Sequence, residues 1–177
     1  IQLAGYDVYY EEKSPQTRQR FIKNLRKACD WAEEAQVVLA IEIMDDPFIS
    51  SIEKYLAIEK EIDSPFLFVY PDIGNVSAWH NDIYSEFYLG HHAIAALHLK
   101  DTYAVTESSK GQFRDVPFGQ GCVKWEEAFD ILKETNYNGP FLIEMWSENC
   151  ETVEETRAAV QEAQAFLYPL IKKAGLM

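Results

Sequence analysis

The sequence has few cysteines, and they are not arranged for a disulfide framework or a thiolate metal site. Cys29, Cys122 and Cys150 are odd in number, lie far apart and form no C-x-x-C motif. Cysteine zinc sites need closely spaced pairs, and small secreted domains need an even set of bridges. We therefore expect a reduced, cytoplasmic protein that is stabilised by an apolar core.

Basic residues are also scarce, with 16 Lys and Arg against 29 Asp and Glu and a net charge of -13. Such a surface repels the phosphate backbone, so we expect no nucleic-acid partner. A small anionic substrate stays compatible, because it responds to the local field of a pocket. No apolar run reaches the ~20 residues that a membrane helix needs, so we expect no membrane partner.

The sequence also lacks a G-x-G-x-x-G segment at a strand-to-helix turn, which argues against a dinucleotide-binding sheet. Its 177 residues, 47% of them hydrophobic, suffice for one domain with a sizeable core. We expect residues 1–177 to belong to one domain.

Strand-like and helix-like segments alternate along the chain. Apolar runs of strand length cover residues 1–6, 37–43, 66–70, 94–99 and 141–146, and amphipathic segments of helical spacing follow them, one of them over 76–90. This alternation predicts a parallel sheet with helices outside it.

A closed (β/α)8 TIM barrel needs eight strands and typically ~250 residues, so five β-α units correspond to its last five. We expect the first three strands to be absent from this sequence, which opens on Ile1 directly at a strand. A polar segment over 102–122 is expected to be a long loop, and loops of this length are more often functional than idle.

Four ionisable residues lie at the ends of four successive apolar runs. They are Glu42 in AIEIMDD, Asp72 after FLFVYP, His98 in AALHLKD and Glu144 in FLIEMW. One acidic residue at a strand end is usually a cap or a loop ion pair, but parallel strands open onto one face where active sites lie. Buried carboxylates are normally paired or bound to a metal. Three carboxylates and an imidazole suit one divalent ion, Mn²⁺, Zn²⁺ or Co²⁺.

Neighbouring residues allow two interpretations each. Lys100 could hold a substrate oxygen or phosphate, or pair with Asp101. Asn75 could donate to a substrate hydroxyl, or cap the helix that follows it. Trp146 could cover a sugar ring or simply pack, and Phe118 to Gly121 could form a tight turn over the site or a plain loop.

Six segments together carry a family resemblance: IQLAGYDVYY, AIEIMD, YPDIGN-x-SAW, HLKDT, VPFGQG and LIEMWSE. Over essentially the whole chain, the sequence resembles the L-ribulose-5-phosphate 3-epimerases, also described as L-xylulose-5-phosphate 3-epimerases and earlier as hexulose-6-phosphate isomerases. These belong to the xylose-isomerase-like TIM barrel superfamily. The resemblance implies inversion of C3 in a ketopentose 5-phosphate through an enediolate. It also implies one divalent metal ion bound by Glu42, Asp72, His98 and Glu144.

The resemblance further implies that Glu42 and Glu144 are the acid/base pair. From their positions beside the four strand ends, we expect Asn75, Lys100 and Trp146 to contact the substrate. Some related ketose epimerases carry a His where Asn75 stands, so substrate contacts there should differ. The expected partner is a small phosphorylated ketose, and family members often form homodimers.

Three other functions remain open at this stage. An aldose-ketose isomerase would use the same metal site. A phosphodiesterase of the endonuclease IV kind is disfavoured by only four histidines and the charge of -13. An incomplete, non-catalytic barrel fragment would act only by association through its exposed sheet edges.

Overall fold

A computed structural model of the protein describes residues 1–177 and shows one arc of five parallel strands. These are β1 (Gln2–Ala4), β2 (Leu39–Glu42), β3 (Leu67–Tyr70), β4 (Leu97–Leu99) and β7 (Phe141–Ile143). Parallel ladders join β1 to β2, β2 to β3, and β4 to β7. Two parallel bridges, Val69 to Ile94 and Asp72 to His98, connect β3 with β4. The predicted parallel arrangement is confirmed.

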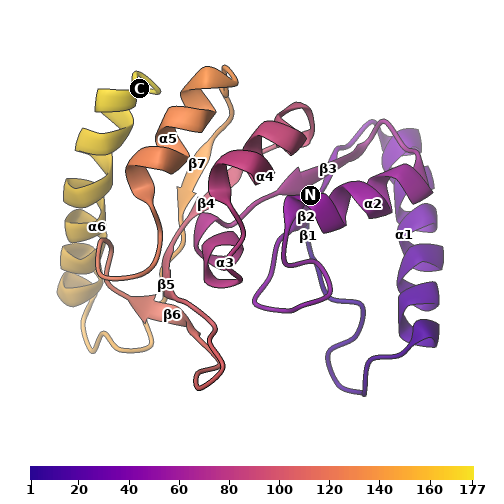
Figure 1. The fold of residues 1–177 in the computed structure, drawn as a ribbon, viewed down its shortest axis with the longest axis horizontal. Helices are drawn as coiled ribbons and strands as arrows, with labels where there is room; N and C mark the ends of the chain where they lie inside the picture. The colour runs from indigo at the N-terminus through magenta and orange to yellow at the C-terminus, as the bar shows by residue number, and fades with distance from the viewer.

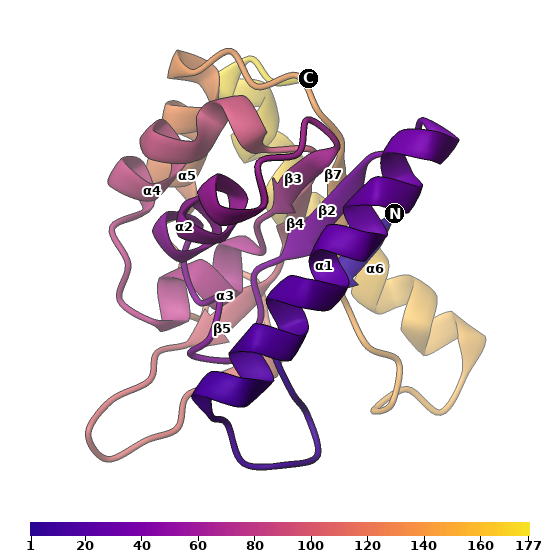
Figure 2. The same ribbon diagram turned by 90° about the vertical axis from the view of Figure 1, so that its right-hand side faces the viewer.

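Five helices cover one face of these strands and stand side by side around the arc (Figures 1 and 2). They are α1 (Pro15–Ala35), α2 (Ile52–Ile62), α4 (Ile83–Gly90), α5 (Trp125–Glu134) and α6 (Val153–Ala174). Ser14 and Thr152 begin α1 and α6 with capping boxes, in which each hydroxyl accepts a backbone N–H three residues later. The helices and strands enclose a core cluster of 30 buried residues, which fixes the positions of the strand ends.

Residues 76–90 form two helices instead of the single helical segment that their spacing predicts. The short α3 (Ile73–Ala78) ends at Trp79, and α4 begins after Asp82, whose side chain accepts the Ser85 N–H. Between them, His80 has a left-handed backbone with φ 60°. That conformation interrupts a right-handed helix, so Trp79 is not in register with the buried Ile83 and Phe87 of α4.

The expected long loop over 102–122 contains an antiparallel hairpin, so that expectation is wrong. Its strands are β5 (Asp101–Tyr103) and β6 (Gln112–Val116), and the hairpin extends from the end of β4 (Figure 1). The hairpin satisfies the backbone groups of a polar segment without much apolar burial, which is why no hydrophobic pattern reveals it.

The α2 and α4 helices pack very closely at Gly90, the last residue of α4. A Cβ atom at this position would lie 2.2 Å from Ile52 Cγ2. His91 and His92 follow in a short 3-10 helix, η1 (His91–Ala93), and both are exposed. Among all the helices, none combines the length and the apolar character that crossing a membrane requires.

Candidate metal centre

Glu42, Asp72, His98 and Glu144 converge at the carboxyl ends of the strands, as the sequence predicts. Glu42 is the last residue of β2, His98 lies within β4, and Glu144 directly follows β7. Asp72 follows β3 and is the N-cap of α3. One potential ligand atom from each residue lies within 4.8 Å of the others.

The His98 imidazole stands at the centre of this cluster. Its Nδ1 atom is 2.7 Å from Glu42 Oε1, 3.3 Å from Glu144 Oε2 and 4.0 Å from Asp72 Oδ2. One ring nitrogen therefore faces three carboxylates from three other strands.

Two carboxylate oxygens of the cluster fit the role of cation ligands. Asp72 Oδ2 and Glu144 Oε2 are buried and accept no hydrogen bond of good geometry, although the Lys100 ammonium lies 2.9 and 3.2 Å from them. Three other oxygens have donors: Asp72 Oδ1 accepts the Asn75 N–H, Glu42 Oε2 accepts from Gln2 Nε2 at 2.6 Å, and Glu42 Oε1 lies 2.7 Å from His98 Nδ1. Burying several carboxylates together is costly, and a bound cation offsets that cost. The four side chains thus fit one divalent ion.

Lys100 lies against the same two oxygens. Its Nζ atom is 2.9 Å from Asp72 Oδ2 and 3.2 Å from Glu144 Oε2, and its side chain is 8% exposed. The alternative pairing of Lys100 with Asp101 is wrong. Three carboxylates and one dication leave one negative charge, which this ammonium can neutralise.

Asp101 instead anchors the loop after β6. Its carboxylate accepts the backbone N–H groups of Gly119 at 2.8 Å, Gly121 at 3.1 Å and Val123 at 3.3 Å, and the Trp125 Nε1–H at 3.3 Å. A Cβ atom at Gly121 would lie 2.0 Å from Asp101 Oδ1, so the loop needs glycine there to wrap the carboxylate. Phe118 to Gly121, which were expected either to turn over the site or to form a plain loop, therefore lie in a loop that the Asp101 carboxylate holds in place.

Asn75 does not cap the helix, because Asp72 does. The Asn75 side chain donates to the carbonyl of Ile43 at 2.8 Å and so ties the end of β3 to the end of β2. Its Oδ1 atom is buried without a donor. A substrate contact from Asn75 stays a prediction.

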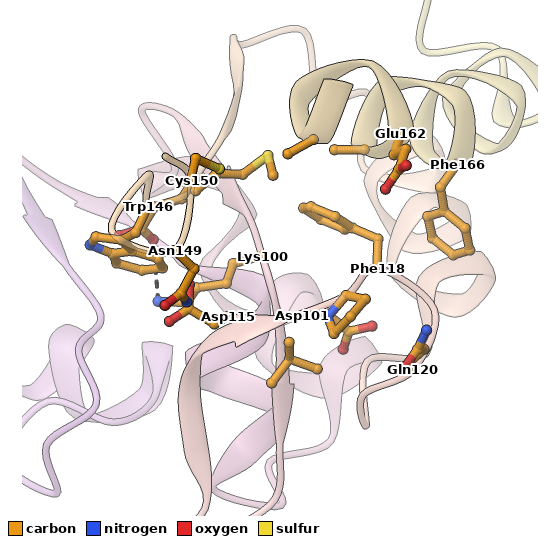
Figure 3. Close-up of a pocket in the computed structure, with 16 residues that line it drawn as sticks. Lys100, Asp101, Asp115, Phe118, Gln120, Trp146, Asn149, Cys150, Glu162 and Phe166 are labelled. Carbon is orange, nitrogen blue, oxygen red and sulfur yellow. Dashed lines mark ion pairs between the residues drawn. The ribbon is translucent and has the colours of Figure 1, made fainter. Parts of the chain in front are cut away.

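A cavity of about 420 Å³ adjoins the cluster and shares Lys100 and Glu144 with it. Lys100 and Trp146 lie on one side of the cavity, and Phe118 and Phe166 lie on the other (Figure 3). Lys100 Nζ is 5.1 Å from the centre of the Trp146 ring, a cation–π distance. Trp146 thus lines a space next to the cation site, as an aromatic cover for a sugar ring would.

The electrostatics of the cluster shift its ionisation equilibria. Burial disfavours the His98 imidazolium, but hydrogen bonds to Glu144 and Glu42 outweigh it and raise its pKa to about 9. Burial, together with the neighbouring Glu144 carboxylate, raises the pKa of Asp72 well above its ordinary value. Burial also opposes ionisation of Glu144, yet His98, Asp72 and Lys100 lower its pKa. The Asp72 carboxyl is therefore harder to ionise than the Glu144 carboxyl.

We expect the chain in chelator to lose stability as the pH rises from about 6.5 to about 9. The folded-state pKa of His98 is raised, so its contribution is complete below the unfolded value of 6.5 and is lost through about 9. Urea unfolding across this range measures the slope, and a His98→Asn variant should show a flatter one. If the free energy of unfolding fell equally steeply with pH in both proteins, His98 would not be the cause of this pH dependence.

Two residues at the site were not predicted from the sequence. Gln2 in β1 donates to Glu42 Oε2, and the Tyr70 ring packs on the His98 imidazole with 4.4 Å between ring centres. Burial and the nearby carboxylates of Glu42, Glu144 and Asp72 raise the pKa of Tyr70 to about 12. Gln2 was visible as a polar residue in an apolar strand, while Tyr70 resembled an ordinary core aromatic.

Comparison with known proteins identifies the family. A family profile described as xylose isomerase-like TIM barrel matches residues 1–170. The chain belongs to the xylose isomerase-like TIM barrel family. Membership agrees with parallel strands whose carboxyl ends carry the polar cluster.

Curated relatives in this family cover the whole chain. The chain is 52% identical over 177 residues to a putative L-ribulose-5-phosphate 3-epimerase SgbU of Haemophilus influenzae and spans 61% of that protein. It is 46% identical to the L-ribulose-5-phosphate 3-epimerase UlaE of Escherichia coli and spans 59% of it. The chain thus spans about three fifths of the length of these relatives.

Solved structures share the fold of this chain at low sequence identity. A xylose isomerase domain protein of Planctomyces limnophilus superposes on 99% of the chain with a TM-score of 0.75 and 19% identity, and 60% of that protein is covered. An L-ribulose 3-epimerase superposes on 98% of the chain with a TM-score of 0.75 and 17% identity, and 62% of it is covered. The fold of this chain is therefore shared with about three fifths of each of these longer structures.

Proposed function

We propose that this chain carries the cation site and the acid/base residues of a metal-dependent L-ribulose-5-phosphate 3-epimerase. Residues 1–177 would form the C-terminal part of a single TIM-barrel domain, with its last five β-α units. The convergence of Glu42, Asp72, His98 and Glu144 within 4.8 Å carries the proposal. The names of the 46% and 52% identical relatives support the choice of reaction.

Each side chain has a distinct role in this proposal. Glu42, Asp72, His98 and Glu144 hold one divalent ion, and their mixed oxygen and nitrogen donors suit Mn²⁺, Zn²⁺ or Co²⁺. When bound, such an ion acts as a Lewis acid that polarises a carbonyl and stabilises negative charge on oxygen. Lys100 holds the Asp72 and Glu144 carboxylates through its two short ion pairs.

Inversion at C3 requires a base on one face of the substrate carbon and an acid on the other. Glu42 and Glu144 come from β2 and from the end of β7, and both approach His98 Nδ1. The Glu144 side chain is 22% exposed and the Glu42 side chain is 7% exposed, so both carboxylates are largely shielded from solvent. Glu144 also lines the cavity. One glutamate removes the C3 proton, and the other returns a proton to the opposite face.

The substrate would lie in the cavity beside the cluster. Its apolar walls include Trp146 and Phe118, and Gln120 and Asn149 supply amide groups for hydroxyls. Aromatic walls with a few placed polar groups are typical of small-molecule sites. We propose a phosphorylated ketopentose as the ligand, with Asn75, Lys100 and Trp146 among its contacts.

Solvent-deuterium labelling tests the reaction. The chain with Mn²⁺ is incubated with L-ribulose 5-phosphate in D₂O, and the products are analysed by NMR. Deuterium at C3 together with L-xylulose 5-phosphate is the expected result. Label confined to C1 or C2 would instead establish an aldose-ketose isomerase, and no label at any carbon would leave the inactive-fragment alternative.

A further inference from the structure

The carboxylate of Glu42 is held by an amide from the neighbouring strand. Gln2 in β1 donates from Nε2 to Glu42 Oε2 at 2.6 Å. The second carboxylate oxygen, Oε1, lies 2.7 Å from Nδ1 of His98 at the centre of the cluster. The two oxygens of Glu42 therefore have different neighbours, a neutral amide outside the cluster and the imidazole within it.

The register of the sheet brings this glutamine to the carboxylate. The β1 strand lies beside β2, and their parallel ladder pairs Ala4 with Glu42 and Gln2 with Ala40 (Figure 1). Side chains two residues apart in a strand lie on the same face, so Gln2 and Ala4 share the face of Glu42. An alanine at the paired position is too short to contact the carboxylate. A glutamine one step earlier on that face is long enough to reach it.

The amide can orient the Glu42 carboxylate without changing the charge of the cluster. The last torsion of a glutamate side chain is broad and roughly two-fold, so a carboxylate needs fixed partners to keep one rotation. Gln2 supplies such a partner on Oε2, which leaves Oε1 as the oxygen that faces His98. Lys100, by contrast, contacts two other carboxylates of the cluster with a charged group. The contribution of Gln2 is therefore geometric, while that of Lys100 includes charge.

We propose that Gln2 is a positioning residue for Glu42, and that its amide keeps a single oxygen of this carboxylate turned toward the cation cluster. The inference rests on the proposed function, in which Glu42 is both an ion ligand and one of the two groups that move the C3 proton. Without the amide, the carboxylate can rotate to a different orientation. Proton transfer requires the base within hydrogen-bond reach of the proton that it removes, and a misplacement of about 1 Å can cost about 10²-fold in rate.

Kinetic measurements on the Mn²⁺-loaded Gln2→Met variant test this role. Methionine keeps the length of the side chain and removes the donor, and Gln2 is exposed, so the variant should fold. We expect kcat for L-ribulose 5-phosphate to fall by about 10- to 100-fold, while KM and the Kd of Mn²⁺ change by less than about 3-fold. Misplacement of a proton-transfer group lowers kcat, whereas general loss of the site would also weaken the binding of ion and substrate.

Gln161→Met is the matched control, because Gln161 is an exposed glutamine of α6. It should leave kcat, KM and the Kd of Mn²⁺ at the wild-type values. A kcat for Gln2→Met equal to that of Gln161→Met would overturn the proposal. A rise in KM at unchanged kcat would also overturn it, because Gln2 would then serve substrate binding and not the orientation of Glu42.

Crystal structures separate this inference from the proposed function. The chelator-treated wild type and Gln2→Met are compared, so the result depends on neither turnover nor ion binding. The Glu42 carboxylate should keep its contact with Gln2 in the wild type, and it should rotate or occupy two conformers in the variant. A rotated carboxylate supports the positioning role even if the chain epimerises no sugar. The same single orientation in both proteins overturns that role, whatever the outcome of the labelling experiment.

Discussion

Glu144→Gln is expected to lower the rate of C3 proton exchange by about 10³-fold, within the range that general acid–base groups contribute. Glutamine keeps the size of the side chain but can neither accept the proton nor carry the charge. It also removes the negative charge at Oε2, which faces His98 Nδ1 and Lys100 Nζ. The exchange rate is measured by NMR in D₂O at saturating Mn²⁺, and Mn²⁺ affinity is measured separately by calorimetry.

Glu151→Gln provides the control for this experiment. Glu151 lies in the same loop, is exposed, and undergoes the same change of charge. Its exchange rate and Mn²⁺ affinity should match those of the wild type. Normal C3 exchange in Glu144→Gln would refute the acid/base role, and unchanged Mn²⁺ affinity would refute the ligand role.

Asp101→Ala is expected to destabilise the fold by about 3–5 kcal/mol, because it leaves several buried hydrogen-bond donors without an acceptor. The carboxylate accepts hydrogen bonds from backbone N–H groups of the loop after β6 and from the Trp125 indole. An alanine cannot replace these acceptors, and water has little access to a residue that is 1% exposed. The free energy of unfolding in urea measures the loss.

Asp82→Ala gives a reference for this loss. Asp82 is an exposed N-cap that accepts one backbone N–H at 2.8 Å, and removing such a cap costs ~1 kcal/mol. Asp101→Asn should lie between the two, because the amide keeps one acceptor oxygen. A loss in Asp101→Ala no larger than that in Asp82→Ala would show that the loop after β6 does not depend on this carboxylate.

The strands and the cation cluster were predictable because each has a recognisable local sequence pattern. A strand buried on both faces is continuously apolar, so Glu42 and His98 stand out within their runs. Asp72 and Glu144 stand out because each closely follows such a run. The parallel topology then places all four strand ends at one edge.

The details that were missed depend on contacts between distant segments. Nothing near Asp101 shows that glycines about 20 residues later will donate to it. The hairpin is held by backbone pairing of polar residues, which has no hydrophobic signature. Asp72 and Asn75 are both good N-cap residues, so the sequence alone could not decide which of them begins α3.

The four cluster residues come from four different strand ends, and the outermost pair, Glu42 and Glu144, frames the central half of the chain. No short stretch of polypeptide can assemble such a binding site by itself. Tight ion capture must therefore wait until every β-α unit from β2 to β7 has docked. Once captured, the ion would oppose local opening of any one of them, because it stabilises only the fully assembled form. The affinity for the divalent ion is consequently a direct measure of how completely the strands from β2 to β7 have assembled.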